Sequence, residues 1–123
     1  MTPVKAIYKT GIYVGEQEDK KNGRVLINIL AVVKHPMQGD LHNPKQADVP
    51  FFQERRALSP GERTWVPEHT VKPFEGQVPD YRVSLRQALR EQEEELKKIG
   101  DDFAERSLLC LSQLKRDYGL FDS

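Results

Sequence analysis

Two histidines and a carboxylate occur close together at His35, Asp40 and His42, and these residue types can ligate zinc or manganese. Their spacing matches no compact zinc motif, and the single cysteine, Cys110, cannot supply a set of thiolate ligands. Pro36 suits the second position of a type I turn, and Asp40 suits an Asx-type turn. We therefore predict a loop held by its own hydrogen bonds, without a metal ion or other cofactor.

Aromatic and arginine side chains follow this loop within a few residues. Phe and Arg are enriched at the anchors of protein interfaces. Adjacent side chains of a strand point to opposite faces, so one of two neighbouring phenylalanines must lie away from the interior of a sheet. Either another part of the chain or a partner protein covers it, and the sequence leaves both open. The predicted partner-binding residues are His35, Gln38, Asp40, His42, Phe51, Phe52, Arg55 and Arg56.

The sequence contains little that suggests catalysis. Cys110 lies between Leu109 and Leu111 and has no neighbouring histidine in the sequence to activate its thiol. A cysteine in an apolar run is most often a small packed hydrophobic residue. The glycines of the N-terminal half are not followed by the helix that a phosphate-binding loop requires. We therefore predict no catalytic residues and a protein that is not an enzyme.

Composition and charge restrict the partners and the cellular compartment. The 123 residues carry 19 Lys/Arg and 19 Asp/Glu, so net charge alone favours no polyanion. Residues 1–66 hold 10 Lys/Arg and 7 Asp/Glu, whereas residues 67–123 hold 9 and 12. A single cysteine agrees with a reducing compartment, and no apolar run approaches the roughly 20 residues of a membrane span. The first residues resemble no signal peptide, and we expect a cytoplasmic protein.

The N-terminal half shows the alternation and the β-branched residues that are typical of strands. Asn22-Gly23 precedes the most apolar stretch and suits the turn of a β-hairpin. A helix competes for residues 24–33, but that hairpin turn and the excess of Val and Ile favour a strand. The predicted strands are residues 4–9, 12–14, 24–33, 49–52, 56–58 and 64–66. They predict a small antiparallel sheet, curled into an SH3-like barrel over residues 1–66.

The C-terminal part has the period of a helix from residue 80 onward. Asp80 can cap the first turn, and Gly100 suits a left-handed end. Asp102 with Glu105 resembles a capping box for a second helix, which Gly119 ends. We therefore predict an α+β protein in which residues 67–79 connect the barrel to a helical hairpin over residues 80–123. The hairpin is predicted to pack on the barrel, because isolated helices of this length are marginally stable.

Several segments of the chain resemble one known family. They are residues 10–16, residues 30–47 with the motif KHPMQGDLHNPKQA at 34–47, residues 49–58, residues 75–81 and residues 103–108. These segments are similar to kinase-associated protein B of spore-forming Firmicutes, and the likeness covers nearly the whole chain. The resemblance implies an antiparallel sheet or barrel with a helical extension. It also implies an accessory factor for a sensor histidine kinase that feeds the phosphorelay controlling sporulation.

Two further expectations follow for the function. The family has been described as a lipoprotein, but this sequence shows no signal peptide or lipobox, and we predict no direct membrane insertion. We expect a regulatory protein that binds a sensor histidine kinase, at the inner face of the membrane only through that partner. The alternative is a small nucleic-acid-binding SH3-like domain that uses Lys34, Lys45, Arg55 and Arg56, although the neutral charge does not favour nucleic acid.

Overall fold

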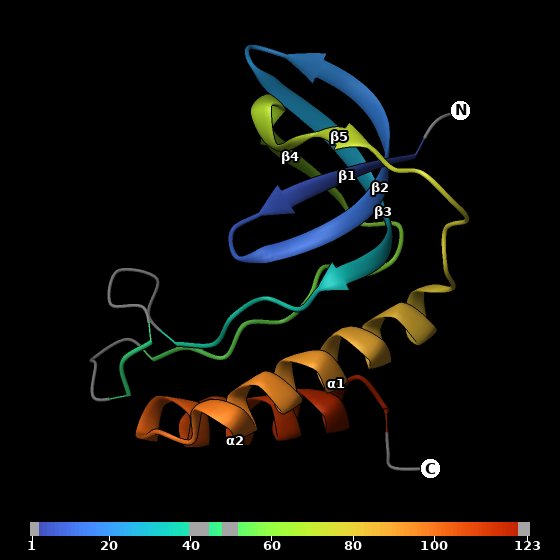
Figure 1. Cartoon of the computed structure of the whole chain (residues 1–123). Coiled ribbons are helices and arrows are strands. Elements are labelled where there is room, and N and C mark those ends of the chain that lie inside the picture. Colours follow the sequence, from blue (N-terminus) through green and yellow to red (C-terminus); the bar gives the residue numbers. More distant parts are fainter. Residues whose placement is uncertain (1–2, 40–44, 48–51, 121–123) are drawn as a thin grey trace. The chain divides into compact units, whose positions relative to one another are not determined.

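The computed structural model describes residues 3–39, 45–47 and 52–120. It contains a five-stranded antiparallel sheet and two C-terminal helices (Figure 1). The strand order is β4-β3-β2-β1-β5. The strands are β1 (Pro3–Tyr8), β2 (Gly11–Lys21), β3 (Arg24–Lys34), β4 (Arg63–Pro67) and β5 (Lys72–Pro73). The predicted α+β class is confirmed.

Local sequence explains the central hairpin of the sheet. Asn22 and Gly23 have φ angles of 51° and 75°, the left-handed conformation that a tight two-residue turn needs. β2 and β3 then pair from Lys21↔Arg24 outward, with three irregularities in register. In β3 the buried residues Val25, Ile27 and Ile29 alternate with less buried neighbours, as in a strand with one face on a core.

The predicted closure into an SH3-like barrel is not confirmed. Within the described residues, β4 and β5 form the two edges of the sheet, and no ladder joins them. β5 has only two residues, and its Pro73 lacks the N–H that a ladder requires. The connection predicted for residues 67–79 contains β5 and a single 3₁₀ turn, η1 (Glu68–Thr70), which the sequence analysis missed.

Two of the predicted strands are corrected. Residues 56–58 form no strand, because the backbone of Leu58 bonds to side chains instead of a ladder. Its N–H donates to the hydroxyl of Tyr13 (3.3 Å), and its carbonyl accepts from the hydroxyl of Tyr81 (2.6 Å). In the predicted strand 49–52, residues 49–51 lie outside the described residues and Phe52 is not in a strand.

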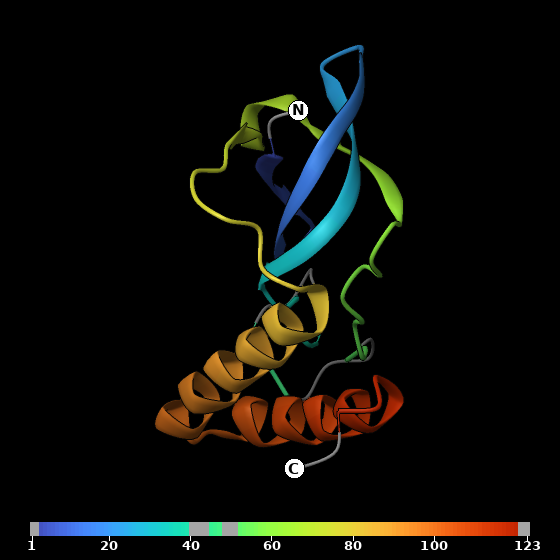
Figure 2. The ribbon, with the colours of Figure 1, turned by 90° about the vertical axis from the view of Figure 1, so that its right-hand side faces the viewer.

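The helices are α1 (Tyr81–Ile99) and α2 (Asp102–Asp117). As predicted, the Asp80 carboxylate accepts from the N–H of Val83 (3.2 Å), and Gly100 ends α1 with a φ of 66°. The cap of α2 lies one residue earlier than predicted, because the carboxylate of Asp101 accepts from the N–H of Ala104 (2.7 Å). α2 folds back from the end of α1 (Figure 2).

The contacts of the chain divide it into two compact units. Unit 1 comprises Met1–Pro36 and Ala57–Ala88, and unit 2 comprises Met37–Arg56 and Leu89–Ser123. In unit 1 the hydroxyl of Ser84 joins α1 to the sheet, since it accepts from the N–H of Val32 (2.9 Å). In unit 2 the ion pair of Glu93 with Lys115 (3.6 Å) joins the end of α1 to α2. The packing of the hairpin on the sheet stays a prediction.

Candidate functional site

His35, the first of the predicted site residues, belongs to unit 1 and is fully buried directly after β3. Its Nδ1 lies 2.9 Å from the carbonyl oxygen of Pro36. A carbonyl oxygen only accepts hydrogen bonds, so this contact places a proton on Nδ1. The His35 side chain therefore bonds to the backbone of Pro36 in the segment that follows β3, and the side chain itself is not accessible to a partner.

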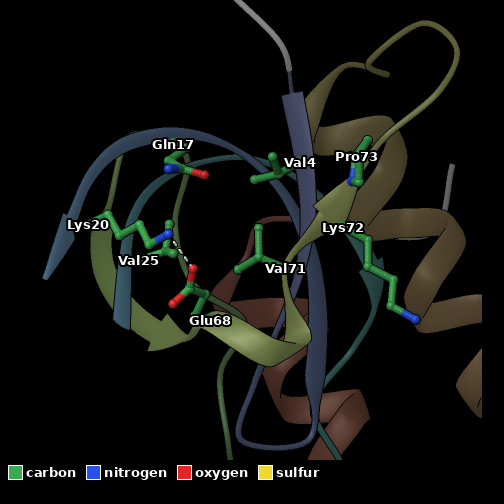
Figure 3. Close-up of a pocket in the computed structure, with 8 residues that line it drawn as sticks. All are labelled: Val4, Gln17, Lys20, Val25, Glu68, Val71, Lys72 and Pro73. Atoms are coloured by element: carbon green, nitrogen blue, oxygen red, sulfur yellow. Dashed lines mark ion pairs between the residues drawn. The ribbon is translucent and has the colours of Figure 1, made fainter. Parts of the chain in front are cut away.

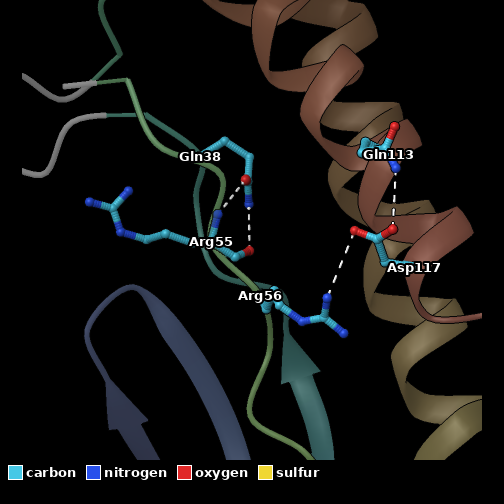
Figure 4. Close-up of polar contacts among 5 residues, drawn as sticks. All are labelled: Gln38, Arg55, Arg56, Gln113 and Asp117. Carbon is cyan, nitrogen blue, oxygen red and sulfur yellow. Dashed lines mark hydrogen bonds and ion pairs between the residues drawn. The ribbon is translucent and has the colours of Figure 1, made fainter. Parts of the chain in front are cut away.

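Within unit 2, the side chain of Gln38 joins the segment that follows β3 to the segment around Arg55. Its side-chain oxygen accepts from the N–H of Arg55 (2.8 Å), and its amide nitrogen donates to the carbonyl oxygen of Arg55 (3.0 Å) (Figure 4). Gly39 and Gln53 add an isolated antiparallel bridge, with N–O distances of 3.0 and 3.3 Å. The guanidinium of Arg55 also donates to the carbonyl oxygen of Gly39. The buried side chain of Gln38 therefore joins residues 38–39 to residues 53–55 by hydrogen bonds, as a ladder between two strands would.

Phe52 lies among aromatic and cationic groups of α2. Its ring meets that of Phe103 edge to face, with centroids 6.1 Å apart. The guanidinium of Arg106 lies 4.3 Å from the Phe52 centroid and donates to the carbonyl oxygen of Ala47. Gly39 has a φ of 107°, and a Cβ there would lie 3.3 Å from the Phe52 ring, so the site favours glycine on both counts.

Arg56 makes the second arginine–aromatic contact of unit 2. Its guanidinium lies 5.3 Å from the centroid of Tyr118 and 3.8 Å from a carboxylate oxygen of Asp117. The other Asp117 oxygen accepts from the amide of Gln113 at 3.2 Å (Figure 4). Exposed Arg56 is thereby oriented by a cation–π contact and a long ion pair, which are weak interactions at a surface.

These contacts form two arginine–aromatic pairs in unit 2, Arg106 on Phe52 and Arg56 on Tyr118. We call these four residues together the aromatic–arginine surface. Phe52 and Arg56 were predicted site residues, whereas Arg106 and Tyr118, about 50 to 60 positions later in the sequence, were not. No local pattern pairs residues so far apart. The predicted site residues Asp40, His42 and Phe51 lie outside the described residues.

Electrostatics distinguish Cys110 from a reactive cysteine. Burial raises the pKa of its thiol, the carboxylate of Glu54 raises it further, and the guanidinium of Arg106 lowers it. The net direction is upward, so the neutral thiol predominates near neutral pH and the nucleophilic thiolate is scarce. These surroundings agree with a half-buried cysteine of low reactivity on α2.

We expect Cys110 to react slowly with a soluble thiol reagent at neutral pH, and its rate to rise steeply with pH because the thiolate is the nucleophile. Urea at unfolding concentrations should accelerate labelling strongly, since it removes the burial that raises the pKa. The measurement is the labelling rate in native and unfolded protein, with a small free thiol as the reference. Equal rates for native protein and free thiol would contradict a packed Cys110.

Unit 1 holds a cavity of about 340 Å³ beside η1 and β5 (Figure 3). Its lining is Val4, Gln17, Lys20, Val25, Glu68, Val71, Lys72 and Pro73. The ammonium of Lys20 pairs with the carboxylate of Glu68 at 2.5 Å. The lining therefore combines four apolar side chains with the amide of Gln17, the Lys20–Glu68 ion pair and Lys72. It contains no nucleophile with a neighbouring general base.

The described residues show neither a metal-binding cluster nor a membrane-spanning helix. No group of three or more His, Cys, Asp or Glu side chains within them is arranged to hold a metal ion. Neither of their helices combines the length and the apolar character needed to cross a bilayer. Asp40 and His42 lie outside the described residues, so the loop without a metal ion stays a prediction.

Comparisons with known proteins agree with one another. A family model described as kinase associated protein B matches residues 8–119. Kinase-associated lipoprotein B of Bacillus subtilis (strain 168) is 50% identical over 115 residues, which cover 94% of this chain and 90% of that protein. The crystal structure of kinase-associated protein B from Bacillus cereus has a TM-score of 0.82 and 43% identity, over 97% of this chain and 95% of that one.

Proposed function

This chain belongs to the kinase-associated protein B family, and we propose that it is a non-enzymatic accessory protein that binds a sensor histidine kinase. In this proposal it supports the output of that kinase to the sporulation phosphorelay. The family relationship supports an accessory role in association with a kinase, and the residues of unit 2 suggest how binding occurs.

The observation that carries the proposal is the aromatic–arginine surface of unit 2. Aromatic and arginine side chains are the residue types that most often dominate binding energy at protein interfaces. Arg106 contacts Phe52 and Arg56 contacts Tyr118, so these arginine side chains are already partly ordered. Binding a partner therefore costs less side-chain entropy than it would for unrestrained arginines. We therefore assign direct contact with the kinase to this surface.

The other predicted site residues receive different roles in the proposal. His35 and Gln38 are buried, and we assign them the support of the segment that presents the surface. Arg55 is partly buried, and its guanidinium is bonded to the carbonyl oxygen of Gly39, so it shares this supporting role. Asp40, His42 and Phe51, which lie outside the described residues, remain proposed contacts.

Binding raises kinase output if the protein has higher affinity for the active conformation of the kinase than for the inactive one. The ratio of the two affinities limits the shift in population, and equal affinities would shift nothing. Its place of action in this proposal is the cytoplasmic side of the membrane, where it is held by the kinase. The word lipoprotein in the name of the Bacillus subtilis relative suggests a lipid anchor as another route to the same membrane.

The test titrates the purified protein against the cytoplasmic portion of a sporulation sensor kinase while autophosphorylation from ATP is followed. We expect saturable binding and a rise in phosphorylated kinase with the same concentration dependence. The protein alone should hydrolyse no ATP. Binding to nucleic acid that weakens steeply with salt, without binding to the kinase, would favour the SH3-like nucleic-acid-binding alternative instead.

A further inference from the structure

Two lysines oppose each other directly at the edge of the sheet in unit 1. Lys5 of β1 pairs with Lys72 of β5 in the antiparallel ladder, and both side chains are exposed. Directly opposed side chains share a face, with Cβ atoms about 5 Å apart. Alternation places Ile7 on the same face as Lys5, and Ile7 is 42% exposed. The edge therefore presents two ammonium groups beside an apolar side chain.

The opposite face of this edge belongs to the cavity. Val4 and Pro73 form the neighbouring ladder pair and line it. Lys72 also borders the cavity, but Figure 3 shows that its ammonium end points away from the other lining residues. We call Lys5, Ile7 and Lys72 the lysine edge.

The positive charge of the lysine edge is not neutralised within the described part of the chain. Neither Lys5 nor Lys72 has an ion pair there. The carboxylate of Glu68, on the adjoining 3₁₀ turn, is already paired with Lys20. Glu16 opposes Pro3, on the diagonal from Lys5, and forms no ion pair with it. Like charges directly opposite each other destabilise an antiparallel pair, so the fold gains nothing from this arrangement.

The backbone of this edge cannot accept an added strand. Pro73 has no N–H, and the N–H of Val71 already donates to the carbonyl oxygen of Glu68 (3.0 Å). On the neighbouring part of β1, the N–H of Ile7 donates to the hydroxyl of Thr70 (3.3 Å). A partner must therefore be recognised through side chains rather than through main-chain pairing.

We propose that the lysine edge binds an acidic segment of a partner protein. A carboxylate of the segment lies between the ammonium groups of Lys5 and Lys72, and an adjacent apolar side chain covers Ile7. Charge complementarity favours an acidic partner, because a bound carboxylate reduces the repulsion between the ammonium groups of Lys5 and Lys72. The competing explanation is that edge lysines only prevent association between sheet edges.

The test measures binding of a fluorescein-labelled peptide of alternating glutamate and leucine by fluorescence anisotropy. Titrations are made at low salt and at about 0.15 M ionic strength, where the Debye length is about 8 Å. Lys72→Glu is the principal variant, since it creates an ion pair with Lys5 and should keep or raise the melting temperature. Lys21→Glu is the matched control, because it makes the same change in net charge at an exposed position of β2.

We expect Lys72→Glu to bind the peptide about tenfold more weakly than Lys21→Glu, within the range of interfacial charge pairs. Lys72→Gln, which keeps the size without the charge, should lie between Lys72→Glu and the parent. Equal binding by Lys72→Glu and Lys21→Glu would overturn the proposal, as would a parent that does not bind the peptide. Capture by anionic phospholipid vesicles in preference to the peptide would also overturn it. The probe is not the kinase, so failure here is distinguishable from failure of the proposed kinase association.

Discussion

Leu111→Ala is expected to lower the free energy of unfolding by about 2–5 kcal/mol, the range of buried leucines. Leu111 is 1% exposed on α2, on the same face as the buried side chains of Phe103, Ala104 and Leu114. Truncation removes the transfer free energy of the lost methyl groups and leaves a space that the neighbours fill only in part. The measurement is equilibrium unfolding in urea, followed by helical circular dichroism.

The same helix offers a matched control for this experiment. Leu109 is 73% exposed, and Leu109→Ala removes the same atoms from water instead of from a core. We expect it to change the free energy of unfolding by no more than about 0.5 kcal/mol. If Leu111→Ala also stays within that limit, α2 is loosely attached and contributes little to the stability of the chain.

Arg56→Ala is expected to weaken association with the kinase by about 2 kcal/mol or more, which is roughly a thirtyfold rise in Kd. The stability of the fold should change by only about 0.5 kcal/mol, because exposed Arg56 has just a 3.8 Å ion pair and a surface cation–π contact. Titration of each purified variant against the cytoplasmic portion of the kinase measures the effect. His42→Ala tests the residues outside the described part of the chain in the same assay.

The control is Arg86→Ala, which removes an exposed arginine from the unit 1 part of α1 and should bind like the parent. Loss of binding in both arginine variants would indicate an effect of net charge rather than of the aromatic–arginine surface. Parent-like binding by Arg56→Ala and His42→Ala together would place the kinase contact elsewhere in the protein. If both variants unfold, residues 35–56 stabilise the fold and the proposed site is wrong.

The predicted and observed sites differ mainly in what surrounds each residue. Residue type indicated that Phe52 and Arg56 are anchors, but it could not show that Arg106 and Tyr118 of α2 contact them. His35 and Gln38 were predicted from their place in a polar loop, whereas the structure buries both. A histidine or glutamine in a loop has no sequence pattern that distinguishes an exposed side chain from one that bonds to the backbone.

By itself the sequence determined the features that depend on a few adjacent residues. Asn22-Gly23 made the hairpin turn, Asp80 capped α1, and Gly100 ended it, because each needs only a local φ angle or one short hydrogen bond. The periods of the two halves likewise predicted strands and helices, since one buried face imposes a repeat of two or of 3.6 residues.

Only the tertiary structure decided the features that join distant residues. The backbone of Leu58 bonds to the hydroxyls of Tyr13 and Tyr81, so a segment with strand-like composition forms no strand. Lys5 opposes Lys72 only because the register of β1 and β5 places them together, 67 positions apart in the numbering. Such contacts depend on register and packing across the whole chain, and no local period or residue preference encodes them.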